Sequence, residues 1–288
     1  MKATRTTQKA LSQFWTPPVV AEFMLDLVGF DPLWKVMDPA CGEGVFLWKA
    51  LERGAGAVAG IDIDPGALEQ ARRLLRDHLT KVRLYCQDGL EDVRDENAFW
   101  RGDYDLVIGN PPFAATGARV RDPRVLKRFQ LSKVRVGRER LLQQPLLEID
   151  LERPKPSQAI EVLFLERFIQ LCKPGGRVCI ILPEGIFANR SLQHVREWLV
   201  QNFMIRAVIG LPRETFKAVG TTAKTAILYL EKRSPREGHE VLLAEVSWIR
   251  VDGAGRLNRE DNPQLVGLLE TWSRLQEAGT KPARGSKA

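Results

Sequence analysis

Cysteine and histidine are scarce in this chain. Its 288 residues include 4 cysteines and 3 histidines. There is no Cys-x-x-Cys pair, and His78, His194 and His239 are scattered, which argues against a metal site. Cys86 and Cys179 fall within apolar strand patterns, so we expect both to be small buried thiols, as is typical of a reducing cytosol.

Long apolar runs are also missing. No segment is long enough to span a bilayer, and no segment has the pattern of a signal peptide. We therefore expect a cytoplasmic protein without a membrane partner. The chain is nevertheless 44% hydrophobic, which is enough for one large α/β domain with a sizeable core.

The third glycine of the dinucleotide-binding motif is absent as well. Residues 36–44, Val-Met-Asp-Pro-Ala-Cys-Gly-Glu-Gly, run from a short apolar strand into a turn that precedes a helix. Gly42 and Gly44 let a ligand approach the backbone closely, but Leu47 stands where the third glycine would be. This weakens the interpretation as a nicotinamide-linked oxidoreductase. A carboxylate at Asp38 would repel a pyrophosphate, whereas it can bind the ammonium group of S-adenosylmethionine.

Two more carboxylates stand at the ends of the next predicted strands. Asp62 ends the second strand, where nucleotide-binding folds place an acidic residue against the ribose hydroxyls. Asp64 precedes a proline and is expected to cap the following helix. Asp88 follows the third strand and could accept a hydrogen bond from the amino group of a cofactor adenine. Three carboxylates at successive strand ends favour a nucleoside-binding cleft.

The most informative segment follows an apolar strand at residues 104–109. Asn110-Pro111-Pro112-Phe113 is stiff and extended, because two prolines fix φ and remove two N–H donors. The Asn110 side-chain oxygen and the Pro111 carbonyl could accept both hydrogens of a planar exocyclic amine, and Phe113 offers a face on which a base can stack. This arrangement suits an amine that attacks a strong electrophile, with no His or Cys nucleophile involved.

Strand and helix patterns alternate along the chain, which predicts an α/β fold with a mostly parallel central sheet and helices on both faces. We expect a single domain at residues 1–278, with an insertion at about 114–156 and a disordered tail at 279–288. The insertion shows little periodicity and is predicted to be a mobile loop. The predicted helices are 18–27, 66–79, 157–172, 192–201 and 265–277, and the predicted strands after the glycine turn are 57–62, 82–87, 104–109, 177–182, 205–211, 224–231 and 241–248.

The insertion is strongly basic. The whole chain has a net charge of +7 and a sequence pI near 9.4, which makes a polyanion partner plausible. Residues 119–140 contain nine Lys or Arg against two acids. Such a segment could bind phosphates beside a flipped nucleotide, although a solvated loop without a specific role stays open. The candidate DNA contacts are Arg119, Arg121, Arg124, Lys127, Arg128, Lys133 and Arg135.

Taken in order, three segments of this sequence resemble the motifs of adenine-N6 DNA methyltransferases. They are Gln-Phe-Trp-Thr-Pro-Pro at 13–18, Asp-Pro-Ala-Cys-Gly-Glu-Gly at 38–44, and Asn-Pro-Pro-Phe at 110–113. The chain is most similar to the modification subunit of type I restriction systems and its solitary relatives. The likeness continues through residues 176–183 and 220–225 and covers roughly residues 8–275. It implies a Rossmann-like S-adenosylmethionine-dependent methyltransferase fold.

The resemblance also implies a role for each matching residue. It places Phe14 and Thr16 at the methionine end of the cofactor, and Asp38 and Ala40 are also expected to bind the cofactor. Gly42 and Gly44 would form its backbone cradle, with Asp62 at the ribose and Asp88 at the adenine. Asn110, Pro111, Pro112 and Phe113 would hold the target adenine, with Phe216 as a second stacking face.

The implied function is site-specific transfer of a methyl group from S-adenosylmethionine to a flipped-out adenine of double-stranded DNA, within a restriction-modification or related defence system. Unlike type I modification subunits, this chain has only a dozen residues before the first motif, and it shows no target-recognition domain. We therefore expect a separate specificity subunit as a partner. The alternatives are methylation of cytosine N4, of a glutamine amide or of an RNA base, and a non-catalytic DNA-binding subunit that keeps the fold.

Overall fold

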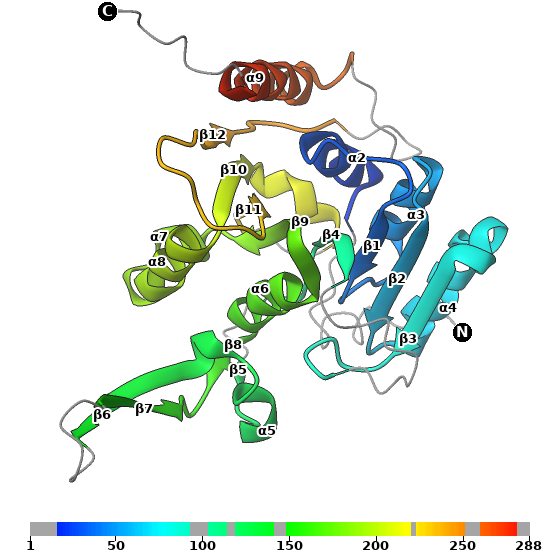
Figure 1. Ribbon diagram of the computed structural model, residues 1–288. Coiled ribbons are helices and arrows are strands. Elements are labelled where there is room, and N and C mark those ends of the chain that lie inside the picture. The colour runs from blue at the N-terminus through cyan, green and yellow to red at the C-terminus, as the bar shows by residue number, and fades with distance from the viewer. Residues whose placement is uncertain are drawn as a thin grey trace, which may run out of the picture.

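The computed structural model describes residues 16–92, 103–113, 119–140, 148–219, 223–250 and 260–280. Its centre is an eight-stranded sheet in the order β12-β10-β11-β9-β4-β1-β2-β3 (Figure 1). Within this sheet β11 runs antiparallel to β9 and β10, and the other neighbouring strands are parallel. The strands are β1 Lys35–Asp38, β2 Ala57–Asp62, β3 Val82–Cys86, β4 Tyr104–Gly109, β9 Cys172–Pro183, β10 Met204–Leu211, β11 Thr225–Glu231 and β12 Leu242–Glu245.

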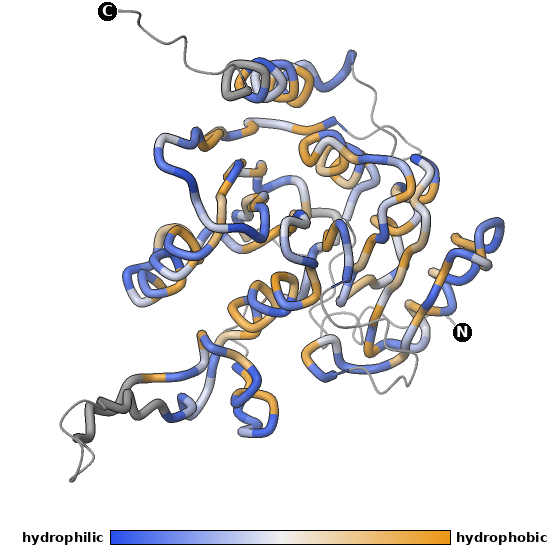
Figure 2. The backbone as a smooth tube through the Cα atoms, in the orientation of Figure 1, coloured by the Kyte–Doolittle hydropathy of each residue, from blue (hydrophilic) through white to orange (hydrophobic). Residues whose placement is uncertain are grey.

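Helices cover both faces of the sheet. Two hydrophobic clusters divide the core, and residues of β9 alternate between them, as expected for a strand buried on both sides. Figure 2 shows apolar colouring along α6, which packs against β9, and mixed colours along the outer helix α4. One cluster includes residues of α2 Pro18–Leu27, α3 Val45–Glu52, α4 Pro65–Leu74 and α9 Pro263–Thr280, and the other includes residues of α6 Ile160–Leu171, α7 Gly185–Ala188 and α8 Gln193–Asn202.

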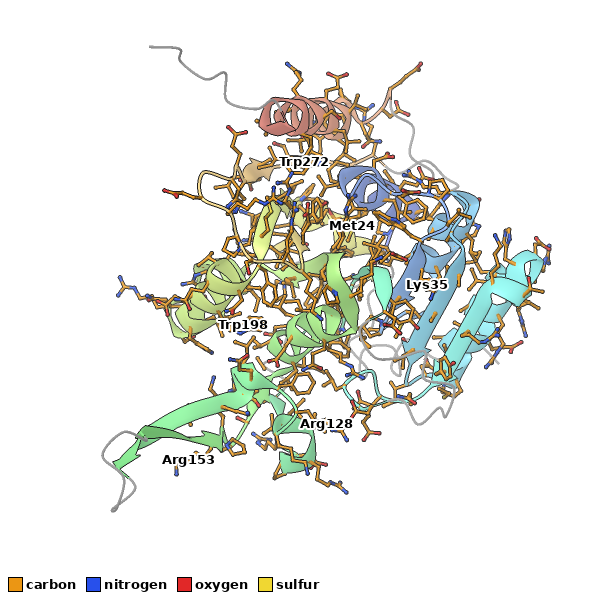
Figure 3. The ribbon with its side chains drawn as sticks, in the orientation of Figure 1. Met24, Lys35, Arg128, Arg153, Trp198 and Trp272 are labelled. Atoms are coloured by element: carbon orange, nitrogen blue, oxygen red, sulfur yellow. The ribbon has the colours of Figure 1, made fainter. Side chains whose placement is uncertain are left out.

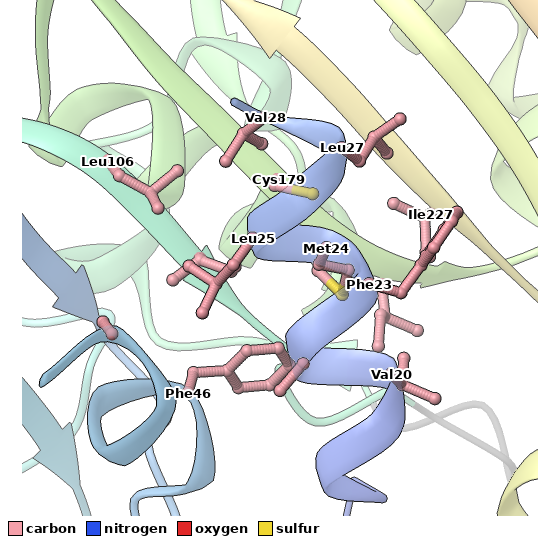
Figure 4. Close-up of a cluster of buried hydrophobic side chains, with 14 of the residues drawn as sticks. Val20, Phe23, Met24, Leu25, Leu27, Val28, Phe46, Leu106, Cys179 and Ile227 are labelled. Atoms are coloured by element: carbon pink, nitrogen blue, oxygen red, sulfur yellow. The ribbon is translucent and has the colours of Figure 1, made fainter. Parts of the chain in front are cut away.

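Helix α2 positions the first part of the site. Pro18 at its start has a fixed φ that suits a first helical turn, and eight of its ten residues are buried. Its apolar surface packs against Phe46 of α3 and against Leu106, Cys179 and Ile227 of the sheet (Figure 4). This packing fixes Thr16, two residues before the helix, at 3% exposure.

The predicted α/β architecture is confirmed, and the differences lie mainly at element ends. The predicted helix at 18–27 matches α2. Asp64 caps α4 through a 2.8 Å hydrogen bond from the Gly66 N–H, as predicted, but α4 ends at Leu74 and a 3-10 turn, η1 Arg76–Lys81, follows. The prediction of a buried Cys86 is wrong: its thiol is exposed, because β3 is the edge strand of the sheet. The tail from 281 onward lies outside the described residues.

The segment at 114–156 contains regular elements in its described part, although its sequence shows little periodicity. The segment contains β5 Arg119–Val120, α5 Pro123–Leu126, a 3-10 turn η2 Gln130–Ser132, and an antiparallel hairpin of β6 Lys133–Arg140 and β7 Glu148–Pro154. The hairpin extends away from the central sheet (Figure 1), and β5 pairs with β8 Gln158–Ala159. Four buried apolar side chains tie this insertion to the second cluster: Val125, Leu126, Phe129 and Leu131.

The remaining short elements are two 3-10 turns, η3 Arg190–Leu192 and η4 Arg213–Val219. In the described part of the chain, no helix has the length and apolarity that a membrane crossing requires. The same residues contain no group of three or more His, Cys, Asp or Glu side chains arranged to hold a metal ion.

Candidate active site

The site lies where the strand order reverses. The chain runs outward from β1 to β2 and β3, and then returns to form β4 on the other side of β1. In open α/β sheets, the crevice at such a reversal is the place where ligands bind. Because β1 and β4 are parallel neighbours, the turn after Asp38 and the turn after Gly109 stand at the same edge of the sheet.

The two glycines of the first turn serve different purposes. Both have left-handed backbone conformations, with φ of +50° at Gly42 and +86° at Gly44. A Cβ at Gly42 would meet no heavy atom within 4 Å, so this position faces open space. A Cβ at Gly44 would lie 3.1 Å from the Cβ of Ala71, so this glycine allows α3 and α4 to pack closely. Gly42 therefore provides the bare backbone that a ligand can approach.

A glycine that the motif analysis did not single out completes this packing. A Cβ at Gly60 on β2 would lie 2.7 Å from both Cys41 Sγ and Leu47 Cδ1. Leu47 can occupy the position of the missing third glycine because the facing strand carries no side chain at this point. A glycine inside an otherwise apolar strand was the sequence signal for such a close approach.

Asp38 is a buried carboxyl whose pKa is strongly perturbed. It is 1% exposed, and its Oδ1 accepts a 3.0 Å hydrogen bond from the Ala40 N–H. A Cβ at Gly109 would lie 2.5 Å from that same oxygen, so only glycine fits beside it. Burial is the main cause that raises the pKa of Asp38 to about 8; the hydrogen bond from Ala40 lowers this pKa and the nearby charge of Asp62 raises it. A cation placed here would restore the ionised form.

Asp62 is the last residue of β2, and Asp88 lies in the loop after β3. The Asp62 oxygens accept backbone hydrogen bonds from Gly42 at 2.7 Å and from Asp64 at 2.9 Å. Asp88 Oδ1 accepts from the Leu90 N–H at 2.9 Å. The loop that contains Asp88 packs on the loop after β1, because a Cβ at Gly89 would collide with the Pro39 carbonyl. The three predicted carboxylates are thus brought to one edge of the sheet.

Ile63 is a neighbour that sequence reasoning missed. It follows Asp62 directly at the carboxyl end of β2, and 57% of its surface is exposed. Few large apolar side chains among the described residues are this exposed, and this one directly follows a candidate cofactor carboxylate. The sequence signal that could have identified Ile63 was its position directly after Asp62, the acidic residue that ends β2.

Asn110 stands immediately after β4 with its amide held in one orientation. Its Nδ2 donates a 3.1 Å hydrogen bond to Thr16 Oγ1. Its Oδ1 is buried and accepts no hydrogen bond from any residue that the structure describes. An unsatisfied buried acceptor costs free energy and marks a position where a ligand donor fits. Pro111 is buried, Pro112 is half-buried and Phe113 is 1% exposed, so the ring face of Phe113 is covered in this conformation.

Two predicted stacking or cofactor residues are not seen at the site. Phe14 lies outside the described residues. Phe216 is 0% exposed and belongs to the first hydrophobic cluster, so it presents no free face to a base. Its aromatic ring follows the general preference of large apolar side chains for the core.

The candidate DNA contacts surround α5 and the base of the hairpin. Arg119 donates to the Ser157 hydroxyl at 2.8 Å, and Arg124 pairs with Asp122 at 2.9 Å. Figure 3 shows Arg128 in this region, well separated from Trp272 of α9. Exposed positions are held by Arg119, Arg121, Arg124, Lys127, Arg128 and Lys133, whereas the side chain of Arg135 lies outside the described residues.

These features define a class I S-adenosylmethionine-dependent methyltransferase fold. A solved structure of that class from Listeria monocytogenes matches 88% of this chain and 69% of its own with a TM-score of 0.63 and 23% identity. The chain belongs to the N-6 DNA methylase family, whose model matches residues 1–279.

The chain is also similar to methylase and modification subunits of type I restriction enzymes. The chain is 24% identical to a type I restriction enzyme EcoEI methylase subunit from Escherichia coli, over 77% of the chain and 43% of the relative. It is 23% identical to a type I MjaVII methylase subunit from Methanocaldococcus jannaschii, over 92% and 45%. A type I modification subunit structure from Vibrio vulnificus covers 94% of this chain with a TM-score of 0.66 and 19% identity, and 55% of its own length is matched. The chain thus spans about half the length of these relatives.

Proposed function

We propose that this chain is an S-adenosylmethionine-dependent DNA methyltransferase that methylates the exocyclic amine of adenine N6 in duplex DNA. The observation that carries the proposal is the buried Asn110 Oδ1, which has no hydrogen-bond donor among the described residues. The Thr16 hydroxyl orients the other end of the same amide. An acceptor held in this way suits an NH₂ group, and the Pro111 carbonyl would take its second hydrogen.

The residues of the glycine turn fit the cofactor. Gly42 faces open space, and Asp38 is a buried carboxyl that a cationic amino-acid group would ionise. We assign the methionine end to Thr16 and Asp38, with Phe14 and Ala40 beside them. Gly42 and Gly44 would line the backbone path, Asp62 would hold the ribose, and Asp88 would hold the adenine. When bound, S-adenosylmethionine supplies an electrophilic methyl group on a sulfonium.

The chain's own residues then contribute positioning and electrostatics. A base that leaves the duplex pays a few kcal/mol in lost stacking. Hydrogen bonds to Asn110 and Pro111 strengthen as the amine gains positive charge during attack, which lowers the barrier. Stacking on Phe113 requires that the groups covering this ring move aside, since it is 1% exposed here.

Removal of the Asn110 acceptor tests the proposal. Asn110→Ala should lower kcat by about 100-fold or more, a typical loss for one such hydrogen bond. The affinity for S-adenosylmethionine should stay close to that of the parent, because the cofactor carboxylates are untouched. Asn202→Ala is the matched control, since Asn202 lies on α8 and bonds only to the Trp198 carbonyl among described residues. Methylation retained by Asn110→Ala would reject the assignment.

The substrate is tested by tritium transfer from labelled cofactor. Duplex DNA, RNA and protein are compared, and the labelled nucleoside is then identified. We expect N6-methyldeoxyadenosine; N4-methyldeoxycytidine, labelled RNA or a labelled glutamine amide would each replace the adenine assignment by one of the alternatives. A chain that binds the cofactor and DNA without any transfer would be a non-catalytic subunit.

We further propose that a separate specificity subunit selects the DNA site and that the protein acts in the cytoplasm as part of a restriction-modification system. The similar proteins named methylase or modification subunits support this, because each is one part of a larger assembly. Sequencing for methylated positions in cells that express the chain alone and with neighbouring subunits tests the partner. Site-specific methylation by the chain alone would contradict it.

The basic insertion is proposed to bind DNA phosphates. The test is a triple variant with Arg121→Ser, Arg124→Ser and Lys127→Ser. The slope of log affinity for DNA against log salt concentration should become shallower by up to about 3, because each lost phosphate contact contributes about 0.9 to that slope. The control removes the same charge from α4 and its end, with Arg72→Ser, Arg73→Ser and Arg76→Ser, which are all more than half exposed. Equal slopes for the two triple variants would reject the role.

A further inference from the structure

Arg167 is a buried cation on α6 that faces the loop after β3. Its side chain is 8% exposed. Its Nε donates to the Gly89 carbonyl at 3.0 Å, and its Nη2 donates to the Glu91 carbonyl at 2.7 Å. The guanidinium thus holds two carbonyl groups on either side of Leu90. This is the loop that carries Asp88, the proposed contact to the cofactor adenine.

The loop is fixed from its other side as well. Gly89 packs so closely on the Pro39 carbonyl that no side chain fits there, and its Cβ position lies 3.1 Å from Phe164 of α6. Leu90 is 2% exposed and donates its N–H to Asp88 Oδ1. Arg167 and Phe164 therefore define where Asp88 stands relative to the loop after β1. Lysine could not replace this geometry, since one ammonium cannot match the planar fork of a guanidinium.

The same loop is reached from the basic insertion. Arg128, two residues after α5, places its Nε 3.8 Å from Asp92 Oδ2 and its Nη1 3.5 Å from the Leu90 carbonyl. Arg167 Nη1 lies 3.5 Å from the other oxygen of Asp92. The carboxylate of Asp92 is thus shared by one cation from the insertion and one from α6.

A second set of contacts fastens the insertion to the same part of α6. The Glu166 carboxylate accepts from the N–H groups of Gln130 and Leu131 at 2.7 and 2.9 Å. Gln170, one turn further along, donates to the Arg128 carbonyl at 3.2 Å and to Glu166 at 3.2 Å. Two adjacent side chains of α6, Glu166 and Arg167, therefore hold the insertion and the Asp88 loop. A shift of one of these segments would displace the other through α6.

Resting on the proposed function, we propose that Arg167 is a positioning residue for the adenine end of the cofactor and that Arg167, Asp92 and Arg128 couple DNA binding by the insertion to cofactor binding. DNA that engages the basic insertion then fixes the Asp88 loop in its binding geometry. By reciprocity, bound cofactor raises the affinity for DNA by the same factor.

The positioning role is tested with a probe of the adenine end. S-Adenosylhomocysteine is compared with S-inosylhomocysteine, which carries a carbonyl where adenine carries its amino group. The parent chain should prefer the adenosyl ligand by about 10-fold or more, since a carbonyl facing Asp88 lacks the donor that the carboxylate needs. Arg167→Lys should lose most of this preference, because Asp88 is no longer held in place. A purely structural defect would weaken both ligands equally and leave the ratio unchanged, which would overturn the role.

The control for Arg167→Lys is Arg196→Lys on α8. Arg196 also donates to two backbone carbonyls, those of Ile186 and Asn189, but it does so away from the Asp88 loop. It should keep the parent's adenosyl preference. Loss of that preference in Arg196→Lys to the same degree would contradict a specific role for Arg167.

The coupling is tested by the affinity for S-adenosylhomocysteine with and without saturating duplex DNA. This ligand lacks the sulfonium charge, so direct attraction to DNA contributes little. DNA should tighten binding to the parent by about 5-fold or more. Arg128→Ala should bring this ratio close to 1, whereas Arg76→Ala, which removes an exposed cation just after α4, should leave it unchanged.

The outcomes separate this inference from the function on which it rests. The coupling would be overturned if DNA changed the affinity for S-adenosylhomocysteine by the same factor in the parent and in Arg128→Ala. Methyl transfer by the parent would still uphold the proposed function in that case. Failure of the parent to bind any adenosyl ligand would overturn both.

Discussion

The buried carboxyl of Asp38 should make this protein less stable as pH rises. Its ordinary pKa is 3.8, and burial raises it to about 8 in the folded chain. The folded state therefore binds this proton more tightly than the unfolded state, and the resulting stability is present in full below pH 3.8 and is lost as pH rises through 8. Each pH unit in this window removes about 1.4 kcal/mol. Between pH 5 and 8 the loss attributable to Asp38 is on the order of 4 kcal/mol.

Asp38→Asn should remove this dependence. Asparagine keeps an oxygen for the Ala40 N–H but cannot ionise, so the variant should gain stability over the parent as pH rises. The measurement is the free energy of unfolding by urea from pH 5 to 8 for both proteins without cofactor. The same variant should bind S-adenosylmethionine more weakly, because the charge that attracts its ammonium group is gone. Parallel stability curves for the two proteins would show that Asp38 does not titrate in this range and would refute the reasoning.

Two smaller changes test other parts of the site. Gly60→Ala places a Cβ 2.7 Å from Cys41 Sγ and Leu47 Cδ1. It should lower the free energy of unfolding by about 1–3 kcal/mol, measured by urea denaturation. An unchanged free energy of unfolding would mean that α3 shifts without cost to make room for the methyl group. Thr16→Val removes the hydroxyl that orients Asn110 and should lower kcat about 10-fold, measured by methyl transfer. It should also lower the free energy of unfolding by about 1–3 kcal/mol, measured by urea denaturation, because the Asn110 amide loses its acceptor. If kcat were unaffected, the Asn110 amide would not depend on Thr16.

The parts of the fold that periodicity can report were predicted well. Helix α2 is apolar and begins at a proline, and each parallel strand is an apolar run that ends in a polar turn, so both types of element are visible in local sequence. The site followed from the same rule, because parallel strand ends must meet at one edge. Asp38 and Asn110 could thus be placed together without knowledge of their contacts.

The insertion could not be predicted because its structure depends on distant contacts. Helix α5 has only four residues, too few for a periodic pattern. Its apolar residues, Val125 and Leu126, are flanked by Arg124 and Lys127, and they are buried in a cluster that also contains residues of α6. Phe216 shows the opposite case, since an aromatic residue in a polar stretch looks available to a ligand until the core that surrounds it is known.

Arg167 was hidden for a third reason. A charged residue between apolar neighbours on a helix is normally expected to face solvent. Here it is 7% exposed, and its hydrogen bonds go to backbone carbonyls of a loop 76 to 78 positions earlier in the sequence. Burial lowers the pKa of the guanidinium, but arginine stays charged at any physiological pH. Only the packing of that loop on α6 reveals the partner.

The structure also changes which feature separates a methyl donor from a dinucleotide in this cleft. In the sequence, the missing third glycine weighs against a dinucleotide, because that glycine normally permits close packing of helix on strand. Gly60 meets that requirement from the strand, so Leu47 by itself does not exclude a dinucleotide on steric grounds. The discrimination rests instead on Asp38, because a buried carboxyl whose pKa is already raised to about 8 is stabilised by a cation and destabilised by a pyrophosphate.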